Sequence, residues 1–359
     1  MDDFHDSVRR VLASIYDPHT ATDLIAGGTL KGAARHGEQA IVDLVLGYPA
    51  RSWHEPLRMR VVSTLAEARL GPALVSVDQR IVAHEVREGL TPLPEVRNII
   101  AVASGKGGVG KSTTAVNLAL ALAAEGARVG VLDADIYGPS VPRMLGVSGR
   151  PDSPDGKRIV PKTAHGLQCM SIGFLIEEDT PMIWRGPMVT QALQQLLNET
   201  AWDDLDYLII DLPPGTGDIQ LTLSQRVPVS GAVIVTTPQD IALLDARKAL
   251  AMFNKVEVPV LGIVENMSTH VCSNCGHVEP IFGEGGGARM AEQYSVPLLG
   301  QLPLSMAIRE QADSGRPTVI AEPDSAAAHA YLEIARKAAG RLSVRARSKA
   351  MGLPNIVIE

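Results

Sequence analysis

An apolar run at residues 99–103 is followed closely by Gly-Lys-Gly-Gly-Val-Gly-Lys-Ser-Thr at 105–113. A strand, a glycine-rich turn and a helix in this order are typical of the edge of a parallel α/β sheet where phosphate binds. Glycines let backbone N–H groups approach phosphate oxygens, and the N-terminus of the following helix favours their negative charge. The spacing fits the pattern G-x-x-x-x-G-K-[ST]. We therefore predict a phosphate-binding loop made of Gly105, Lys106, Gly107, Gly108, Val109, Gly110, Lys111, Ser112 and Thr113.

This loop carries two lysines, whereas the general pattern requires one. Lys111 can reach the β and γ phosphates, and the Ser112 hydroxyl can ligate Mg²⁺. Lys106 is then an additional cation. In phosphoryl transfer, negative charge spreads over the γ-phosphoryl oxygens. A second cation that stabilises this charge, as an arginine finger does, raises the rate by about 10³ to 10⁵. The loop therefore indicates a nucleotide-hydrolysing enzyme.

From residue 98 onward, short apolar runs alternate with helical patterns. This alternation predicts an α/β fold with a doubly wound, mainly parallel sheet. Hydrophobic residues make up 45% of the chain but aromatic residues only 4%, so the core must consist of Val, Ile, Leu and Ala, as in buried parallel strands. We expect strands at 99–103, 129–132, 207–210, 232–235 and 260–264.

The first ninety residues predict a separate small α+β domain. A helical period covers 4–15, and residues 40–46 and 74–86 have the composition of strands. A second helix is expected around the apolar positions Leu57, Val61 and Leu65. Two prolines and no periodicity follow at 88–97. We expect a small domain over 1–90, a linker over 91–97, a P-loop domain over 98–342 and a tail over 343–359.

Composition excludes some classes of function. A formal net charge of −7 argues against a protein that coats nucleic acid, because such binding relies on surplus Lys and Arg. No stretch reaches the ~18 apolar residues of a spanning helix, and the start lacks the features of a signal peptide. We expect a cytoplasmic protein without nucleic-acid binding or stable membrane association. Three cysteines do not suggest a disulfide framework, so thiol or metal chemistry is expected instead.

Three aspartates follow apolar runs that predict strands. Asp211 ends Tyr-Leu-Ile-Ile-Asp, the pattern of a strand that brings a carboxylate to the Mg²⁺ shell. Asp133 and Asp135 end Val-Gly-Val-Leu-Asp-Ala-Asp, and their i, i+2 spacing places both on the same side of an extended chain. One of them can hold a metal-bound water while the other orients the attacking water. Any one of the three also suits a helix cap or a solvated loop, but all three together favour phosphate chemistry.

Cys272 and Cys275 form a C-x-x-C motif, which suits a turn that directs two thiolates to one metal. A tetrahedral zinc or a [4Fe-4S] cluster usually takes four ligands. Cys169 lies in an apolar stretch and is interpreted as a small buried hydrophobe. A second subunit is the simplest source of the missing ligands, because a two-fold axis presents the pair twice. An intrachain zinc site with His270 and His277, and a redox dithiol, remain alternatives.

Several motifs together resemble the Mrp/ApbC family of iron-sulfur cluster carrier ATPases, over roughly residues 97–340. They are the two-lysine loop, Asp-Ala-Asp-Ile-Tyr-Gly-Pro-Ser at 133–140, Trp-Arg-Gly-Pro at 184–187, Asp-Leu-Pro-Pro-Gly-Thr-Gly-Asp at 211–218 and Cys-Ser-Asn-Cys-Gly-His at 272–277. This family belongs to the deviant-Walker-A group, with MinD, ParA and the nitrogenase iron protein. In that group the extra lysine reaches the nucleotide of the partner subunit. The resemblance therefore implies a homodimer with ATP between its subunits.

The resemblance also implies roles for single residues. The catalytic residues would be Lys106, Lys111, Asp135 and Asp211, with Asp135 activating the attacking water. Mg²⁺ would be held by Ser112 and Asp211, and through water by Asp133. Asn266 matches the asparagine that reads adenine. Cys272 and Cys275 would hold a labile [4Fe-4S] cluster, with zinc as the less favoured occupant, for transfer to apo iron-sulfur proteins.

The small domain resembles the iron-sulfur-assembly domain often fused ahead of this ATPase, with Asp17-Pro18 matching its Asp-Pro element. That domain commonly carries a reactive cysteine, whereas this chain has no cysteine before Cys169. A direct thiol role is thus excluded, and we assign the domain to partner docking or regulation.

Two other functions stay open at this point. One is a MinD-like or ParA-like positioning ATPase on membrane or DNA, for which Arg345, Arg347 and Lys349 in the tail are the available cations, although Gly352 and Pro354 interrupt a helix there. The other is a metal-free ATPase that regulates a bound partner.

Overall fold

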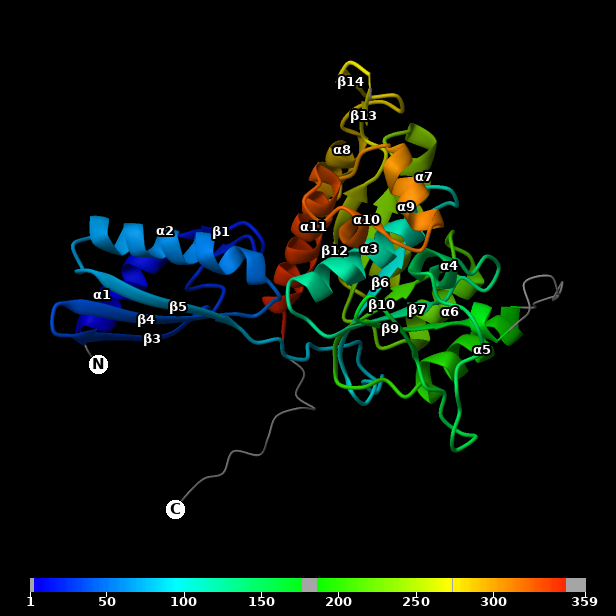
Figure 1. Cartoon of the computed structure of the whole chain (residues 1–359), viewed down its shortest axis with the longest axis horizontal. Coiled ribbons are helices and arrows are strands. Elements are labelled where there is room, and N and C mark those ends of the chain that lie inside the picture. Colours follow the sequence, from blue (N-terminus) through cyan, green and yellow to red (C-terminus); the bar gives the residue numbers. More distant parts are fainter. Residues whose placement is uncertain (1–2, 176–185, 273, 347–359) are drawn as a thin grey trace.

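The structure is a computed structural model that describes residues 3–175, 186–272 and 274–346. Trp184 and Arg185 of the motif at 184–187 lie outside the described residues, as do residues 347–359 of the expected tail. Two bodies are visible in Figure 1, a small one at the N-terminal end and a large one built on a central sheet.

The small domain packs two helices on one face of a three-stranded sheet. Strand β3 (Leu30–His36) pairs antiparallel with β4 (Gln39–Leu46), which pairs parallel with β5 (Ala73–Gln79). Along β4, the alternate residues Ala40, Val42, Leu44 and Leu46 are buried, as the period of two in a half-buried strand requires. Helices α1 (Asp3–Leu12) and α2 (His54–Glu67) lie over that face, and Leu57, Val61 and Leu65 of α2 are buried. The α+β prediction is confirmed.

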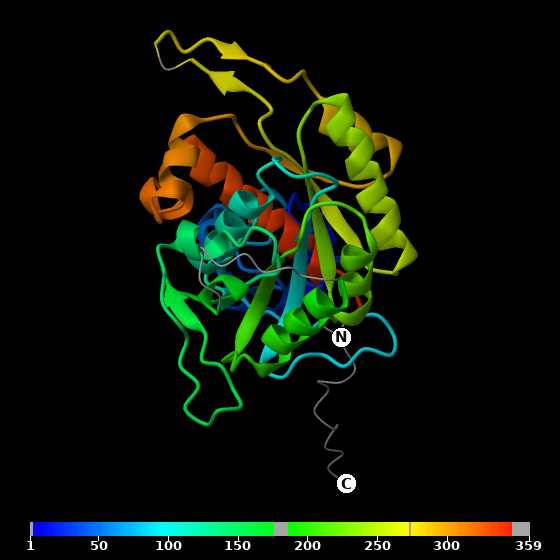
Figure 2. The same cartoon turned by 90° about the vertical axis from the view of Figure 1, so that its right-hand side faces the viewer.

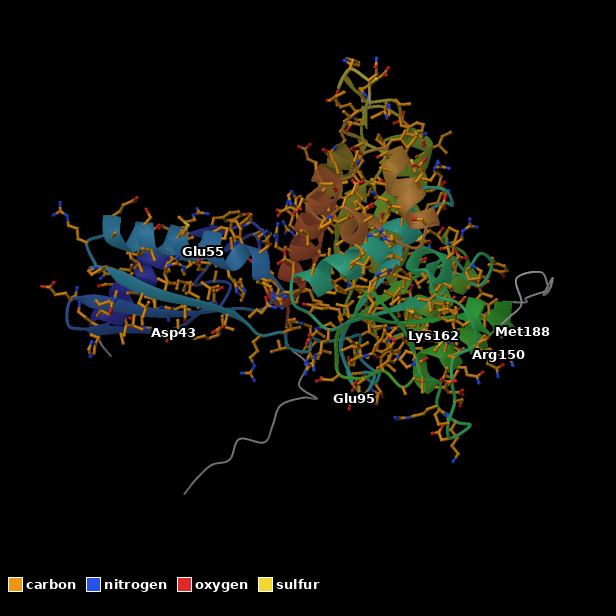
Figure 3. All side chains as sticks on the ribbon, viewed as in Figure 1. Asp43, Glu55, Glu95, Arg150, Lys162 and Met188 are labelled. Atoms are coloured by element: carbon orange, nitrogen blue, oxygen red, sulfur yellow. The ribbon has the colours of Figure 1, made fainter. Side chains whose placement is uncertain are left out.

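The other face of this small sheet is open to solvent. Asp43 on β4 is exposed on the sheet side of the domain, whereas Glu55 lies on the helix side (Figure 3). Short strands β1 (Tyr16–Asp17) and β2 (Thr22–Asp23) and a 3₁₀ turn, η1 (Arg51–Trp53), complete the domain at the end nearest the large body.

The strand expected over 74–86 is shorter than predicted, since β5 ends at Gln79. Beyond it, the Asn98 amide provides hydrogen bonds that a neighbouring strand would otherwise supply. Its Nδ2 donates to the carbonyl of Val82 at 2.9 Å, and its Oδ1 accepts from the backbone N–H of His84 at 3.1 Å. The chain therefore crosses to the large domain as an irregular segment held by the buried side chains of Asn98 and His84, since His84 Nε2 also lies 3.4 Å from the carbonyl oxygen of Ser343.

The large domain contains an eight-stranded sheet in the order β15-β12-β11-β6-β10-β7-β9-β8, parallel except for the terminal strand β8. The five predicted strands are confirmed as β6 (Val96–Ala103), β7 (Val129–Asp133), β10 (Leu205–Asp211), β11 (Gly231–Thr236) and β12 (Val260–Glu265). Buried apolar residues fill all five. Strand β9 (Leu167–Ser171) contains Cys169, which is fully buried as expected.

Two strands at the sheet edges were not predicted. They are β8 (Lys162–Ala164) and β15 (Leu298–Gln301), whose three and four residues are too few to show a period. Strand β6 begins at Val96, inside the segment expected as a linker, because Val96 already pairs with Leu205 of β10.

Helices cover both faces of the sheet, as Figures 1 and 2 show. On one face, α3 (Lys111–Ala124) packs against α10 (Thr318–Ala321) and α11 (Ala326–Ser343). The crossovers through α5 (Gly186–Glu199), α6 (Asp218–Arg226), α7 (Asp240–Lys255) and α8 (Gly286–Gln293) run the other way along the sheet and cover the opposite face. Helices α4 (Val141–Leu145) and α9 (Met306–Asp313) contact each other near the carboxyl ends of the strands. The doubly wound prediction is confirmed.

A hairpin projects from the large domain beyond the ends of its helices (Figures 1 and 2). Its strands are β13 (His270–Val271) and β14 (Val278–Glu279), which pair antiparallel. The C-x-x-C motif lies in the turn between them. In the part of the chain that the structure describes, no helix has the length and apolar character needed to span a membrane.

Candidate functional site

The predicted phosphate loop connects β6 to α3. Gly108 and Gly110 each have φ +80°, in the left-handed region that glycine adopts at little cost. A Cβ atom at Gly105 would overlap the backbone of Asp245 on α7, and one at Gly110 would overlap the Asn266 amide. The local backbone therefore requires glycine at these three positions.

A cavity of about 210 Å³ lies over the loop. Its lining includes Lys106, Gly110, Lys111, Ser112, Thr113 and Asp135, so the structure brings together residues from the loop and from the end of β7. The Lys106 side chain is half-buried, and its ammonium has no hydrogen-bond or ion-pair partner among the residues described. It is therefore a cation that the described contacts of the fold do not use.

Lys111 lies between two acids. Its Nζ is 2.5 Å from Asp211 Oδ1 and 3.8 Å from Asp135 Oδ2, and the side chain is only 6% exposed. Burying an ammonium is unfavourable unless an anion compensates it, and these carboxylates supply that anion. An entering phosphate would offer Lys111 another anionic partner.

Asp211 is fully buried and uses only one of its two oxygens in this contact. Asp211 Oδ2 is buried without a hydrogen-bond partner in the described parts of the chain, and so is Ser140 Oγ in the wall of the same cavity. Buried polar atoms are normally paired, so these two atoms fit a site for a bound ligand. Mg²⁺ prefers carboxylate and hydroxyl oxygens, and the Asp211 carboxylate together with the hydroxyl of Ser112, which lines the same cavity, fits that preference.

Asp133 anchors the loop that follows β7. Its Oδ1 accepts from the backbone N–H of Asp135 at 3.1 Å, and its Oδ2 accepts from the N–H groups of Ser140 at 3.0 Å and Val141 at 3.1 Å. The Ser171 hydroxyl also donates to Oδ2 at 3.1 Å. Burial, and then the charge of Asp211, raise the pKa of Asp133 to about 7. Burial also raises the pKa of Asp135, partly opposed by Lys111.

Asn266 connects the end of β12 to the phosphate loop. Its Nδ2 donates to the carbonyl of Val109 at 2.9 Å, and its Oδ1 accepts from the N–H of Met267 at 2.9 Å. A primary amide has two donors and two lone pairs, so one N–H and one lone pair remain for a ligand. Asn266 borders a second cavity of about 280 Å³ that shares Gly110 and Thr113 with the first.

Sequence reasoning missed most of the lining of this second cavity. Pro303, Leu304, Ile308 and Arg309 form part of its wall, and they follow the unpredicted strand β15. In the sequence these residues are marked only by the short apolar run before them. Many ordinary turns follow such a run. The wall is partly apolar, as a site for the flat base of a nucleotide requires.

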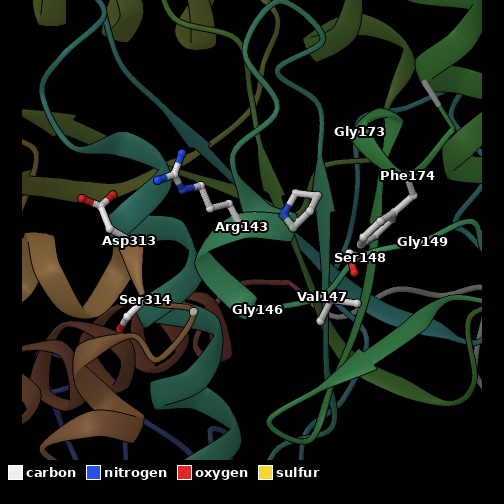
Figure 4. Close-up of a pocket in the computed structure, with 11 residues that line it drawn as sticks. Arg143, Gly146, Val147, Ser148, Gly149, Gly173, Phe174, Asp313 and Ser314 are labelled. Atoms are coloured by element: carbon white, nitrogen blue, oxygen red, sulfur yellow. The ribbon is translucent and has the colours of Figure 1, made fainter. Parts of the chain in front are cut away.

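A further hollow of about 530 Å³ lies between α4 and α9 (Figure 4). Arg143 and Asp313 lie on one side of it and Phe174 on the other. None of the predicted site residues lines this hollow. The charged and polar residues that the sequence predicts converge in the two smaller cavities instead.

The two cysteines of the hairpin form one tight turn. The N–H of Gly276 donates to the carbonyl of Cys272 at 2.9 Å, and the N–H of Cys272 donates to the carbonyl of His277 at 2.9 Å. Hydrogen bonds from the backbone N–H groups of Cys275 and Asn274, and from the Cys275 side chain, lower the pKa of the Cys272 thiol. A thiolate is the form that binds metals. Both cysteines are accessible to solvent.

The described residues contain no group of three or more His, Cys, Asp and Glu side chains that could hold a metal ion. His270 instead contacts the carbonyl of Leu304 through Nδ1 at 3.2 Å. Among the described residues, the structure therefore does not bring His270 and His277 together with the cysteines as an intrachain zinc site. Cys169 lies away from the turn in β9, where burial raises its pKa to about 12.

Comparison with known proteins agrees with these features. Residues 95–339 match the model of the NUBPL iron-transfer P-loop NTPase, and residues 5–78 match that of an iron-sulfur cluster assembly protein. The iron-sulfur cluster carrier protein of Haemophilus influenzae is 53% identical over 342 residues, which cover 95% of this chain and 92% of that protein. The iron-sulfur cluster transfer protein NUBPL of Mus musculus is 53% identical over 253 residues, covering 70% and 79%.

Among solved structures, the nucleotide-binding protein of Archaeoglobus fulgidus in complex with ADP is 38% identical and has a TM-score of 0.57, covering 64% of this chain and 90% of that one. The resemblance inferred from the motifs is thus confirmed over both domains. The chain belongs to the NUBPL iron-transfer P-loop NTPase family, whose relatives include iron-sulfur cluster carrier proteins.

Proposed function

We propose that this protein is an ATP-hydrolysing carrier that binds a labile [4Fe-4S] cluster between two copies of the chain and transfers it to apo iron-sulfur proteins. The observation that carries this proposal is the hairpin turn. It presents two accessible cysteines at the tip of a projecting element, and the described residues add no further ligand.

A cluster of this kind usually takes four cysteine ligands. Two copies related by a two-fold axis provide four thiolates at one position, so the homodimer completes the site that one chain leaves incomplete. The cluster is a cargo, and exposure of the turn suits its release. Zinc is the less favoured occupant of the same four thiolates.

ATP is the proposed substrate of the other site. Its phosphates fit the cavity over the loop, and its base fits the adjoining cavity, where the remaining N–H and lone pair of Asn266 suit adenine. Ser112 and Asp211 would hold Mg²⁺, with Asp133 contributing through water while fixing the neighbouring loop. When bound, Mg²⁺ neutralises charge on the phosphate oxygens.

The protein residues then have separate tasks in hydrolysis. Lys111 moves from its acidic partners to the β and γ phosphates, and Asp135, freed from that contact, orients the attacking water. Lys106 has no partner within the described residues, and we propose that it acts on the nucleotide of the other copy. Hydrolysis would thus depend on the same dimer that completes the cluster site.

Anaerobic reconstitution with iron and sulfide tests the cluster proposal. The wild-type protein should become coloured and bind one [4Fe-4S] cluster per dimer, measured by visible absorbance and iron content. Cys272→Ser should lose both signals, whereas Cys169→Ala, which removes a buried cysteine outside the turn, should keep them. A full iron complement in Cys272→Ser would show that the bridging site is wrong.

A further inference from the structure

Helix α3 extends from the phosphate loop to the small domain. Its first two residues are Lys111 and Ser112, and its last is Ala124. The next residue, Glu125, is only 1% exposed and belongs to the contact with the small domain. One continuous helix therefore has the nucleotide site at its N-terminus and the other domain at its C-terminus.

Glu125 accepts several of the hydrogen bonds in that contact. Its Oε2 accepts from the backbone N–H of Ser52 at 2.8 Å, and its Oε1 accepts from the Ser52 hydroxyl at 2.5 Å. Its carbonyl accepts from Gln79 Nε2 at 3.1 Å and from the N–H of Arg51 at 3.3 Å. Arg336 of α11 donates to Glu125 Oε1 at 2.9 Å, which balances the buried charge.

Arg336 also connects this cluster to a second one. Its Nη2 lies 2.9 Å from Glu333 Oε2, and that oxygen lies 3.2 Å from Nε2 of His19 in the small domain. His19 is 1% exposed, and its Nδ1 lies 3.1 Å from the hydroxyl of Tyr48. Charged hydrogen bonds of this kind are stronger than neutral ones and fix the geometry of the groups they join.

The two backbones also approach closely. A Cβ atom at Gly340 of α11 would lie 2.7 Å from the carbonyl oxygen of His19, and one at Gly47 would lie 3.1 Å from Cβ of Ser343. Only glycine fits the first of these positions without a shift. The small domain is therefore seated directly on α11 and on the end of α3, and Figure 1 shows it at that end of the large body.

We propose that the small domain is an intramolecular regulator of the nucleotide site, in which ATP binding at one end of α3 and docking of the small domain at the other end stabilise each other. This inference rests on the proposed ATP binding. Nucleotide orders Lys111 and Ser112, and the contacts of Glu125 order the opposite end of the same helix. Rigid elements of this kind can carry coupling between distant sites.

Coupling of this kind is reciprocal. If docking raises the affinity for nucleotide by a given factor, nucleotide raises the docking equilibrium by the same factor, typically about 5- to 150-fold. The coupling also gives the small domain a task that needs no cysteine.

Amide hydrogen exchange on the full-length wild-type protein tests the coupling. The N–H groups of Arg51 and Ser52 donate to Glu125, so their exchange reports undocking directly. Saturation with Mg²⁺ and a slowly hydrolysed ATP analogue should slow this exchange at least about fivefold. The N–H of Ala40, which bonds to Pro72 within the small domain, should be unaffected and serves as the control.

Variants test the reciprocal effect. Arg336→Ala removes the bridge between Glu125 and Glu333, and Gly340→Val separates the domains while every charge remains. Both should weaken analogue binding by the factor seen in exchange, whereas His329→Ala, at an exposed position of α11, should not. Analogue binding without protection of Arg51 and Ser52 overturns this inference alone. Absence of any analogue binding overturns the proposed function and this inference with it.

Discussion

Asp133 and Asp211 lie opposite each other in register on β7 and β10, and neither carboxylate is exposed. Lys111 is the one buried cation near them among the described residues, and it contacts Asp211 rather than Asp133. The repulsion contributes to the raised pKa of Asp133. A site with this surplus of negative charge favours a further cation, which supports the proposal that Mg²⁺ enters with the nucleotide.

Lys106→Ala should reduce the rate of ATP hydrolysis by about 10³ with little change in protein stability, because in the proposed mechanism Lys106 supplies a cation to the transition state. The Lys106 ammonium has no hydrogen-bond or ion-pair partner among the described residues, so its removal takes no such contact from the fold. Steady-state hydrolysis and thermal unfolding measure the two effects. Lys248→Ala, at an exposed lysine on α7, is the control. A rate equal to that of wild type would contradict the role of Lys106.

Gly110→Ala should abolish nucleotide binding, whereas Gly107→Ala should keep the fold of the loop. Gly110 has φ +80° and a Cβ there would meet the Asn266 amide, but Gly107 has no atom within 4 Å of such a Cβ. The left-handed conformation alone costs a residue with a side chain about 1–2 kcal/mol. Titration calorimetry with ADP and thermal unfolding compare the pair. Equal binding by both variants would argue against a structural need for glycine at 110.

Asn266→Ala should weaken ATP binding about tenfold, since it removes a buried hydrogen bond to Val109 as well as the groups that face the second cavity. The loss should be larger for ATP than for GTP, because adenine recognition needs the amide itself. Competition between the two nucleotides measures this. An equal loss for both would mean that Asn266 supports the loop and does not read the base.

Much of the candidate site could be located from the sequence because its residues occur in short contiguous motifs. The loop at 105–113 specifies its own turn, and buried parallel strands such as β6 and β10 are apolar runs that end in a polar residue or are followed directly by one. Residues that meet only through tertiary packing leave no such signal. His19 and Glu333 are separated by 314 positions, and neither has neighbours that would mark it as a site. Pro303 and Leu304 were missed because the strand before them has only four residues.

The contact between the domains should depend on pH through His19. Burial alone would lower the pKa of His19. The hydrogen bonds with Asp17 and Glu333, and the negative charges of these two carboxylates, outweigh burial and raise the pKa above 6.5. A raised pKa means that the folded state holds the proton more tightly. The stabilisation is therefore complete below pH 6.5 and is lost as pH rises through the folded pKa.

Asp17 and Glu333, the acidic partners of His19, affect the stability of the contact at low pH. Burial would raise the pKa of Asp17, but hydrogen bonds from His19 outweigh it, and the pKa of Glu333 is lowered first by its bond with His19. Both carboxylates therefore stabilise the folded state above their unfolded pKa values and lose that effect in acid. The contact should be most stable at mildly acidic pH, where the carboxylates are still charged and His19 is still protonated.

His19→Gln tests this assignment. The wild-type melting temperature should fall as pH rises from about 6 to 9, and the variant should show a smaller change over the same interval because it has no titrating group at 19. His329→Gln, at an exposed histidine of α11, should keep the wild-type profile. Parallel profiles for wild type and His19→Gln would show that the charge of His19 does not hold the domains together.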